Sequence, residues 1–333
     1  MFLTVMTLLA GLLAAASPAG HSALAPRPYL VQSVSLPEIF PDMARLTRKQ
    51  YKAAAKTARL ERLLTLPAVR QAGAQADFIL VFTLQEVPGW RHSGLRGRDP
   101  AQNIGFRNDT AGKPVYPAWP RLRGIPLLNS VDFLKPSNAQ LRNSNSTLSA
   151  IHEMGHHWGV YWSDRPDCGP REWTPQEPLI CLMNASSHWT WTWTWTPEKS
   201  LPMPGILYSG PTSAYFNAFD LYAMGLMPYE VASRYVYHVY SERQPKQIYP
   251  VTLKQLLAAL SRRGQAYFDH GGKRIPPLDP DMARIRVLLL LLKDPKESIS
   301  PEADQLLRKL AQDLPADWYQ ATWKRSRLEV VNR

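Results

Sequence analysis

Proline is the feature that most constrains how this chain can fold. The 333 residues contain 30 prolines, and these are scattered along the sequence rather than spaced periodically. Proline breaks the interior of a helix and cannot donate a hydrogen bond to a sheet. We therefore expect many loops and few long, uninterrupted helices. The hydrophobic fraction of 45% is ordinary for a globular protein, so the sequence does not predict wholesale disorder.

The first 25 residues resemble an export signal. The stretch from Phe2 to Ala16 is apolar and too short to span a bilayer comfortably, and Ala23-Leu24-Ala25 supplies a small-x-small cleavage pattern. We expect residues 1–25 to be a signal peptide and the mature protein to be secreted or periplasmic, with no membrane span after signal removal. No Lys or Arg precedes the apolar stretch, so a retained anchor is the alternative reading.

The formal net charge is +12, and it is spread along the chain. Such an excess suits an anionic partner, for example a cell-surface polymer, although a generally basic protein is the plain alternative. No nucleic-acid-binding module or dense basic stripe is present, so we expect no nucleic-acid partner. The two cysteines, Cys168 and Cys181, could form a disulfide in an oxidising compartment, and they lack the CxxC spacing of metal ligands.

Short apolar runs separated by helix-compatible segments define the expected elements. Residues 77–87 indicate a buried strand, and residues 121–134 a strand that Pro126 confines to a sheet edge. Further elements are expected as follows: a helix-prone lead segment at 26–75, a helix at 147–162, a long loop at 163–211, a helix at 216–227, a helix from 251, a strand at 284–293 and one or two closing helices at 301–323.

Residues 189–196 read WTWTWTWT. In a strand, the four Trp side chains would share one face and the four Thr side chains the other. This pattern favours either an aromatic platform for sugar rings or extended peptide, or a slipped repeat packed against the domain.

The segment from Ile151 to Gly159 reads IHEMGHHWG and contains the HExxH pattern. On a helix His152 and His156 lie one above the other, so both imidazoles can converge on one zinc ion. Glu153 projects about 100° round the helix from His152 and can accept a proton without being a ligand. The alternative is an amphipathic helix with incidental histidines.

Zinc in a catalytic site needs a third protein ligand. The extended pattern HExxHxxGxxH fails here, because position 162 is Trp. Glu177 lies between Pro175 and Pro178, which discourage a helix. Asp220 is the better candidate, since it lies in the helix-compatible segment NAFDLYAMGLM that could return across the first helix.

Three motifs carry a resemblance to secreted bacterial zincin-type metallopeptidases: HEMGHHWG, the SSHW at 186–189, and FDLYAMGLMPYEV at 219–231. The resemblance covers roughly residues 76–330. It implies an α+β, zincin-like fold, with a twisted mixed sheet over the HExxH helix and a mostly helical C-terminal lobe. It also implies Asp220 as the third ligand of one zinc ion. The expected organisation is a catalytic region at 76–235 and the lobe at 236–333.

On this reading the chain is a zinc-dependent endopeptidase that acts on a protein or peptide substrate. Zinc-activated water attacks the peptide carbonyl, with Glu153 as general base. Tyr222 is the candidate catalytic hydrogen-bond donor to the oxyanion, and Tyr208 is another; a tyrosine in such a position is more often an ordinary packed residue. A different class remains open: a non-catalytic zinc-containing protein that binds a cell surface or polysaccharide.

Overall fold

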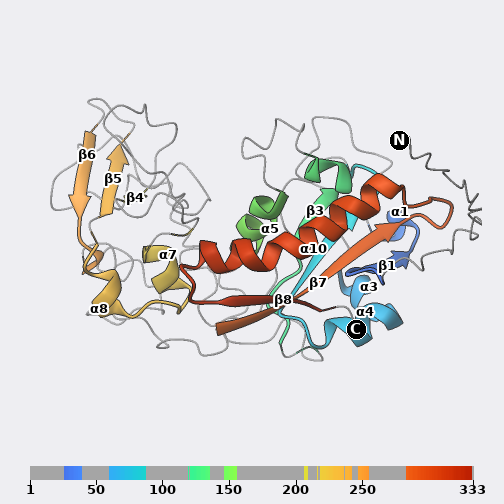
Figure 1. Ribbon diagram of the computed structural model, residues 1–333, viewed down its shortest axis with the longest axis horizontal. Coiled ribbons are helices and arrows are strands. Elements are labelled where there is room, and N and C mark those ends of the chain that lie inside the picture. Colours follow the sequence, from blue (N-terminus) through green and yellow to red (C-terminus); the bar gives the residue numbers. More distant parts are fainter. Residues whose placement is uncertain are drawn as a thin grey trace, which may run out of the picture.

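The computed structural model describes residues 26–39, 60–87, 119, 121–135, 146–155, 206–208, 216, 218–235, 237–241, 247–254 and 283–331. The described strands form a five-stranded sheet and a three-stranded sheet (Figure 1). The expected signal peptide, both cysteines, the Trp-Thr repeat and most of the two segments 163–211 and 255–282 lie outside the described residues.

Strand β7 (Arg284–Lys293) is the centre of the larger sheet. On one side it pairs with β2 (Phe78–Thr83), and on the other side with β8 (Arg327–Val331) along its first half and with β1 (Leu30–Ser33) along its second half. Strand β3 (Leu127–Ser130) pairs with β2 and ends the strand order. The predicted strands at 77–87 and 284–293 and the edge position of 121–134 are confirmed.

Every described pairing in this sheet is parallel. We expected a mixed sheet, so that part of the fold prediction is wrong for the described strands of this sheet, whereas the coarser prediction of a fold with both helices and strands is confirmed. The physical reason is visible in β2 and in the middle of β7. All six residues of β2 are buried, as are Val287 to Leu292, and continuous apolar runs are typical of parallel strands covered on both faces.

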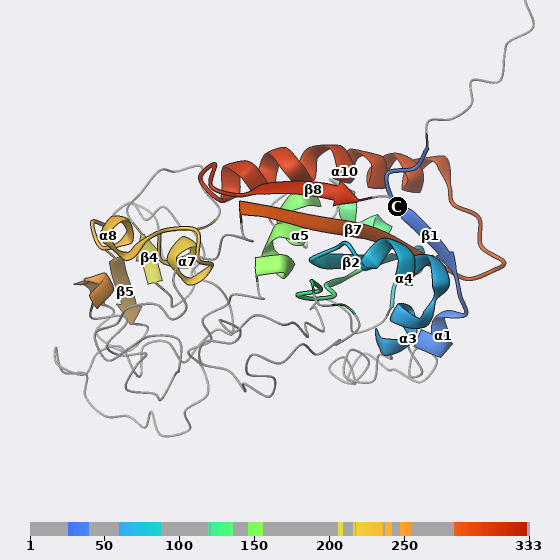
Figure 2. The same ribbon diagram turned by 90° about the horizontal axis from the view of Figure 1, so that it is seen from below.

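Helices cover both faces of this sheet (Figure 2). Alternate residues of β7 point to opposite faces, so Val287 and Leu289 pack in one core cluster and Leu288 and Leu290 in the other. The first cluster contains helices α5 (Ser146–Gly155), α7 (Ala218–Ala223) and α10 (Pro301–Ala321); the second contains α1 (Leu36–Ile39), α3 (Leu60–Thr65) and α4 (Pro67–Gly73). The result is three layers.

The single closing helix α10 shows why this stretch of sequence stays helical. The Ser300 hydroxyl accepts a hydrogen bond from the Ala303 backbone N–H at 3.1 Å, and Pro301 occupies the first turn, where a missing N–H costs nothing. An apolar stripe then faces the sheet; it consists of Leu307, Leu310, Leu314, Trp318 and Ala321, each fully buried. The prediction of one or two closing helices at 301–323 is thus met by one helix, which ends at Ala321.

The central sheet crosses two expected boundaries. Strand β1 comes from the lead segment 26–75, and both β7 and β8 come from the range 236–333, which we expected to be a mainly helical lobe. Strands from both ranges therefore belong to one sheet with β2, which comes from the range 76–235. Short strands outside β7 and β2 are fixed by this pairing rather than by their own apolar content.

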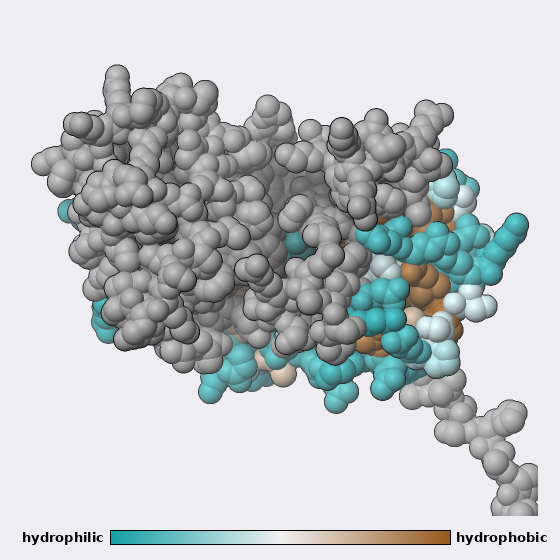
Figure 3. Space-filling model, turned by 90° about the horizontal axis from the view of Figure 1, so that it is seen from above, coloured by the Kyte–Doolittle hydropathy of each residue, from teal (hydrophilic) through white to brown (hydrophobic). Residues whose placement is uncertain are grey.

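The smaller sheet lies beside α7 and α8 (Tyr229–Ala232) in Figure 1. It consists of β4 (Ile206–Tyr208), β5 (Tyr237–Ser241) and β6 (Gln247–Val251), paired antiparallel. The remaining described element is the 3-10 turn η2 (Val131–Leu134). Within the described residues, no helix is both long enough and apolar enough to cross a membrane. In the view of Figure 3, the described surface is mostly hydrophilic, with a smaller hydrophobic area at the right-hand end.

Candidate functional site

Helix α5 carries the first part of the HExxH segment. Its buried stripe is Thr147, Ala150, Ile151 and Met154, the i, i+3, i+4, i+7 spacing of a helix with one face against a core. At the first turn the Thr147 hydroxyl donates a short hydrogen bond to the Asp317 carboxylate of α10. The start of α5 is therefore fixed on α10, and the predicted helix is confirmed up to Gly155.

Glu153 is a buried acid, with only 6% of its surface exposed. A buried carboxylate is costly unless it has partners, and Glu153 does take part in a polar or electrostatic interaction. The backbone of residue 152 belongs to α5, but the His152 side chain and the whole of His156 lie outside the described residues. The convergence of the two imidazoles thus stays a prediction.

Asp220 lies in the first turn of α7 and is 2% exposed. The neighbouring Phe219 and Leu221 are fully buried in the core cluster that also contains apolar residues of α5. Gly225 ends the helix: its φ of 76° is the left-handed conformation that glycine adopts readily. The Leu226 N–H then reaches back to the Leu221 carbonyl at 2.8 Å, the closing bond of a Schellman motif.

The residues around α7 are anchored to the C-terminal end of α10. The Trp323 indole N–H donates to the Phe216 carbonyl at 2.8 Å, and the Phe216 ring meets the Trp318 ring edge to face at 5.9 Å between centroids. The Arg325 guanidinium donates to the Leu226 carbonyl at 3.3 Å. Helix α5 is bonded to Asp317 of α10. The C-terminal end of α10 therefore contacts both the HExxH helix and the segment that contains Asp220.

The backbone of the turn after α10 is strained. Trp323 and Lys324 have φ values of 52° and 62°, a conformation that bulky non-glycine residues rarely adopt. The Trp323 ring packs edge to face against Tyr235 at 5.6 Å, in addition to its bond to Phe216. These contacts offset the cost of the strained turn and fix the segment that contains Asp220.

Tyr222 is 2% exposed, and its ring packs edge to face against Tyr229 of α8 at 6.2 Å. This contact fits the ordinary packed role of Tyr222 and leaves its catalytic role a prediction. Tyr208 belongs to β4, and its side chain lies outside the described part of the chain. The structure therefore describes two of the predicted site side chains as buried carboxylates, Glu153 and Asp220, on two helices of one core cluster.

The described residues contain no group of three His, Cys, Asp or Glu side chains that could hold a metal ion. Two of the three expected ligands, the imidazoles of His152 and His156, are not among those residues. The third, the Asp220 carboxylate, is of a type that zinc accepts. Comparison of the chain with protein families, with curated proteins and with solved structures finds no match.

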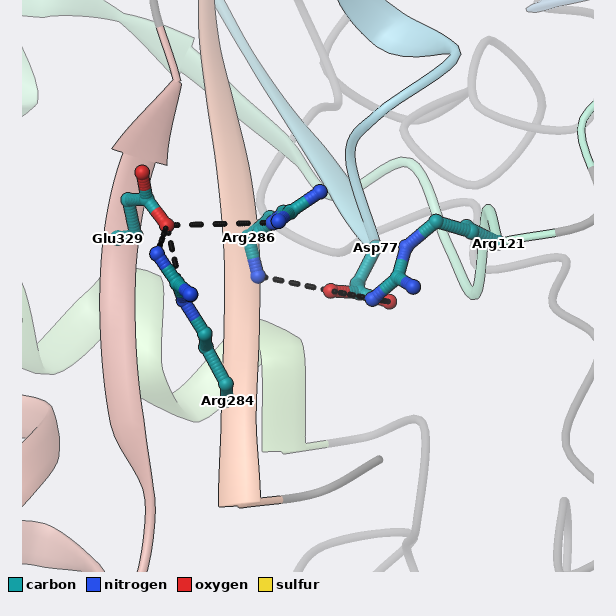
Figure 4. A network of polar contacts seen from close by, with 5 residues as sticks. All are labelled: Asp77, Arg121, Arg284, Arg286 and Glu329. Carbon is teal, nitrogen blue, oxygen red and sulfur yellow. Dashed lines mark hydrogen bonds and ion pairs between the residues drawn. The ribbon is translucent and has the colours of Figure 1, made fainter. Parts of the chain in front are cut away.

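A second polar cluster, which the sequence reasoning missed, lies where the strands of the large sheet begin (Figure 4). Asp77 is 1% exposed and accepts the Arg286 backbone N–H at 2.7 Å. Its carboxylate also forms ion pairs with Arg121 at 3.3 Å and Arg123 at 3.7 Å. Burial raises the pKa of Asp77 above its ordinary value, against the opposing effect of the Arg286 N–H and the two guanidinium groups.

Glu329 of β8 extends this cluster to the sheet edge, with ion pairs to Arg284 at 2.6 Å and to Arg286 at 3.9 Å. In the sequence, the sign of this cluster is the period-two spacing of arginines at 121 and 123 and at 284 and 286. The sequence alone could not show that these arginines meet Asp77, because Asp77 lies 209 residues before Arg286. These contacts hold the strand ends together.

A third cluster fixes the beginning of the described chain to α10. Asp304 accepts hydrogen bonds from Arg308 at 2.8 Å, from Arg27 at 3.0 Å and, at a shorter distance, from the Tyr29 hydroxyl. Burial acts to raise the pKa of Asp304, but the hydrogen bonds from Arg308, Tyr29 and Arg27 outweigh it and lower the pKa to about 2. Burial and the neighbouring Asp304 raise the pKa of Tyr29.

Proposed function

We propose that this chain is a secreted, zinc-dependent endopeptidase of zincin type. The observation that carries the proposal is the arrangement of two buried carboxylates. Glu153 lies in the HExxH helix and Asp220 in a second helix, and both helices are anchored to the same end of α10. Thr147, at the start of the HExxH helix, supplies the contact to α10 through Asp317.

In this mechanism His152, His156 and Asp220 would hold zinc. When bound, zinc lowers the pKa of water toward neutrality and polarises the substrate carbonyl. The Glu153 carboxylate accepts a proton from the attacking water and delivers it to the amine of the leaving peptide.

Replacing Glu153 by Gln tests the catalytic part of the proposal. The amide keeps the shape of the side chain but cannot accept the proton, so we expect hydrolysis of a casein substrate to fall by about 10²–10⁴-fold while zinc stays bound. The exposed Glu230 of α8 supplies the matched control, and Glu230→Gln should leave hydrolysis unchanged. Equal activity of Glu153→Gln and wild type would exclude Glu153 as the base.

Replacing Asp220 by Asn tests the third ligand. A neutral amide is a poor zinc ligand, so we expect the variant to lose bound zinc at a chelator concentration that leaves the wild type loaded, with activity falling in parallel. Far-UV circular dichroism separates this result from unfolding. A folded Asp220→Asn protein that keeps zinc as tightly as the wild type would assign the third ligand elsewhere.

Export is a separate part of the proposal, with its own test. Sequencing the N-terminus of the protein recovered from culture medium or periplasm should give a start at Pro26 if cleavage follows Ala25. A protein that keeps residues 1–25 and stays with the membrane would contradict it.

A further inference from the structure

The outer edge of β8 borders a groove that the proposed peptidase site does not use. The groove has a volume of about 670 Å³, and β8 forms one wall while α10 forms the other. Within the described strands, β8 pairs only with β7, so its second side is an open sheet edge. Open edges of this kind accept an additional strand from a partner.

The direction of the β8 backbone groups follows from those of β7. Arg286 directs both its N–H and its carbonyl toward Asp77, on the β2 side. In a parallel pair the alternation then directs the groups of Ile285 and Val287 toward β8. Ile285 lies opposite Leu328 and Val287 opposite Val330, so the N–H and carbonyl groups of Leu328 and Val330 face the open edge.

The helix wall of the groove offers a further acceptor. Pro315 lies inside α10 and has no N–H to donate to the carbonyl of Ala311, four residues earlier. Both residues line the groove. An extended chain in the groove therefore meets the edge groups of β8 on one side and a helix carbonyl without its helix donor on the other.

The two faces of β8 differ in chemistry, and this difference defines the partner. Leu328 and Val330 turn their side chains toward the apolar layer of α10. On the opposite face lie Arg327, which is exposed and has no ion pair with any described residue, and Arg284, which is 63% exposed. This face of β7 and β8 thus carries three arginines, at 284, 286 and 327, and one carboxylate, that of Glu329, which pairs with Arg284 and Arg286.

We propose that the β8 edge binds an extended segment of another protein in which apolar and acidic side chains alternate. An added strand repeats the alternation of its neighbour, so its apolar side chains fall on the α10 face and its acidic side chains on the arginine face. A second copy of this chain is a poorer occupant, because each copy carries a net charge of +12. This site does not depend on zinc.

The test uses the full-length protein with chelator present, so that no metal-dependent hydrolysis consumes the probe. The probe is a fluorescent, end-blocked peptide of about nine residues that alternates Asp and Val; a Lys-for-Asp peptide and a backbone N-methylated peptide are its controls. Fluorescence anisotropy should show saturable binding of the Asp peptide and at least about tenfold weaker binding of both controls. Hydrogen exchange of residues 327–331 should slow on binding.

Two protein variants locate the contact. Val330→Pro removes an edge N–H without removing a bond to β7 and should weaken binding by at least about tenfold, while Val330→Thr keeps the N–H and should bind within about twofold of wild type. Arg327→Glu should weaken the Asp peptide and strengthen the Lys peptide. Circular dichroism confirms that each variant is folded.

Three results would overturn the proposal. The first is an Asp peptide that does not bind saturably, and the second is binding that a folded Val330→Pro leaves unchanged. The third is self-association of the wild-type protein that Val330→Pro abolishes, which would make a second copy the occupant. Peptidase activity of Val330→Pro is expected to equal that of wild type, so a failure here is separate from a failure of the proposed function.

Discussion

Two pairs of carboxylates in this molecule are held in different ways. Asp77 and Asp304 are surrounded by arginines and backbone donors that join segments far apart in sequence. Glu153 and Asp220 are buried, as Asp77 is, but they lie within the HExxH helix and the FDLYAMGLMPYEV segment, on helices of one core cluster. Burial alone therefore does not mark a reaction centre. The acids that hold the fold join segments far apart in sequence, whereas the acids proposed to perform chemistry lie within the two motifs.

The largest expected effect on stability comes from removing Asp77. Asp77→Ala leaves Arg123, which is 8% exposed, and the Arg286 N–H without their acceptor, so we expect a loss of about 3–5 kcal/mol of unfolding free energy in urea. The control is Asp132→Ala, an exposed acid on a surface ion pair, which should cost less than about 1 kcal/mol. If the Asp77→Ala protein were stable but had lost peptidase activity, Asp77 would have a catalytic role rather than a structural one.

Asp304 should show its structural role through pH. Its pKa is lowered in the folded state to about 2, from an ordinary value of 3.8. The stabilisation is therefore present above about pH 4 and is lost as the pH falls toward 2. We expect Asp304→Asn to lose about 1–2 kcal/mol at pH 7 and the two urea midpoints to converge between pH 4 and 2. A difference that stays constant over this range would mean that the charge of Asp304 contributes nothing.

The smallest expected effect on stability comes from the contact between α5 and α10. Thr147→Val keeps the shape of the side chain but removes its hydrogen bond to Asp317, which should cost about 1 kcal/mol. Thr147→Ser keeps the hydroxyl and should recover most of this loss. If Thr147→Val instead lowers peptidase activity far more than stability, the contact positions the HExxH helix for reaction.

The parts of the fold that sequence predicted are those whose signal is local. Residues 78–83 and 284–293 are continuous apolar runs, and the cap at Ser300 precedes a long amphipathic helix. Strands β1 and β8 were not predicted, because each is short and is held in place by its register with β7. The same is true of the Asp77 cluster, whose members come from three separate segments.

For the candidate site, the sequence predicted the helix that contains Glu153 and a helix at Asp220, since both motifs have helical spacing and the second ends at Gly225. It did not predict that both helices are tied to α10. Those ties depend on Asp317, Trp318 and Trp323, which have no local relation to either motif.

The most direct test of the central claim is X-ray absorption at the zinc edge of the purified full-length protein. The account predicts about one zinc per chain, a shell of nitrogen and oxygen atoms at about 2.0–2.1 Å and the scattering of two imidazole rings. Absence of stoichiometric zinc would contradict it. So would sulfur at about 2.3 Å, which would move the metal from His152, His156 and Asp220 to the cysteines.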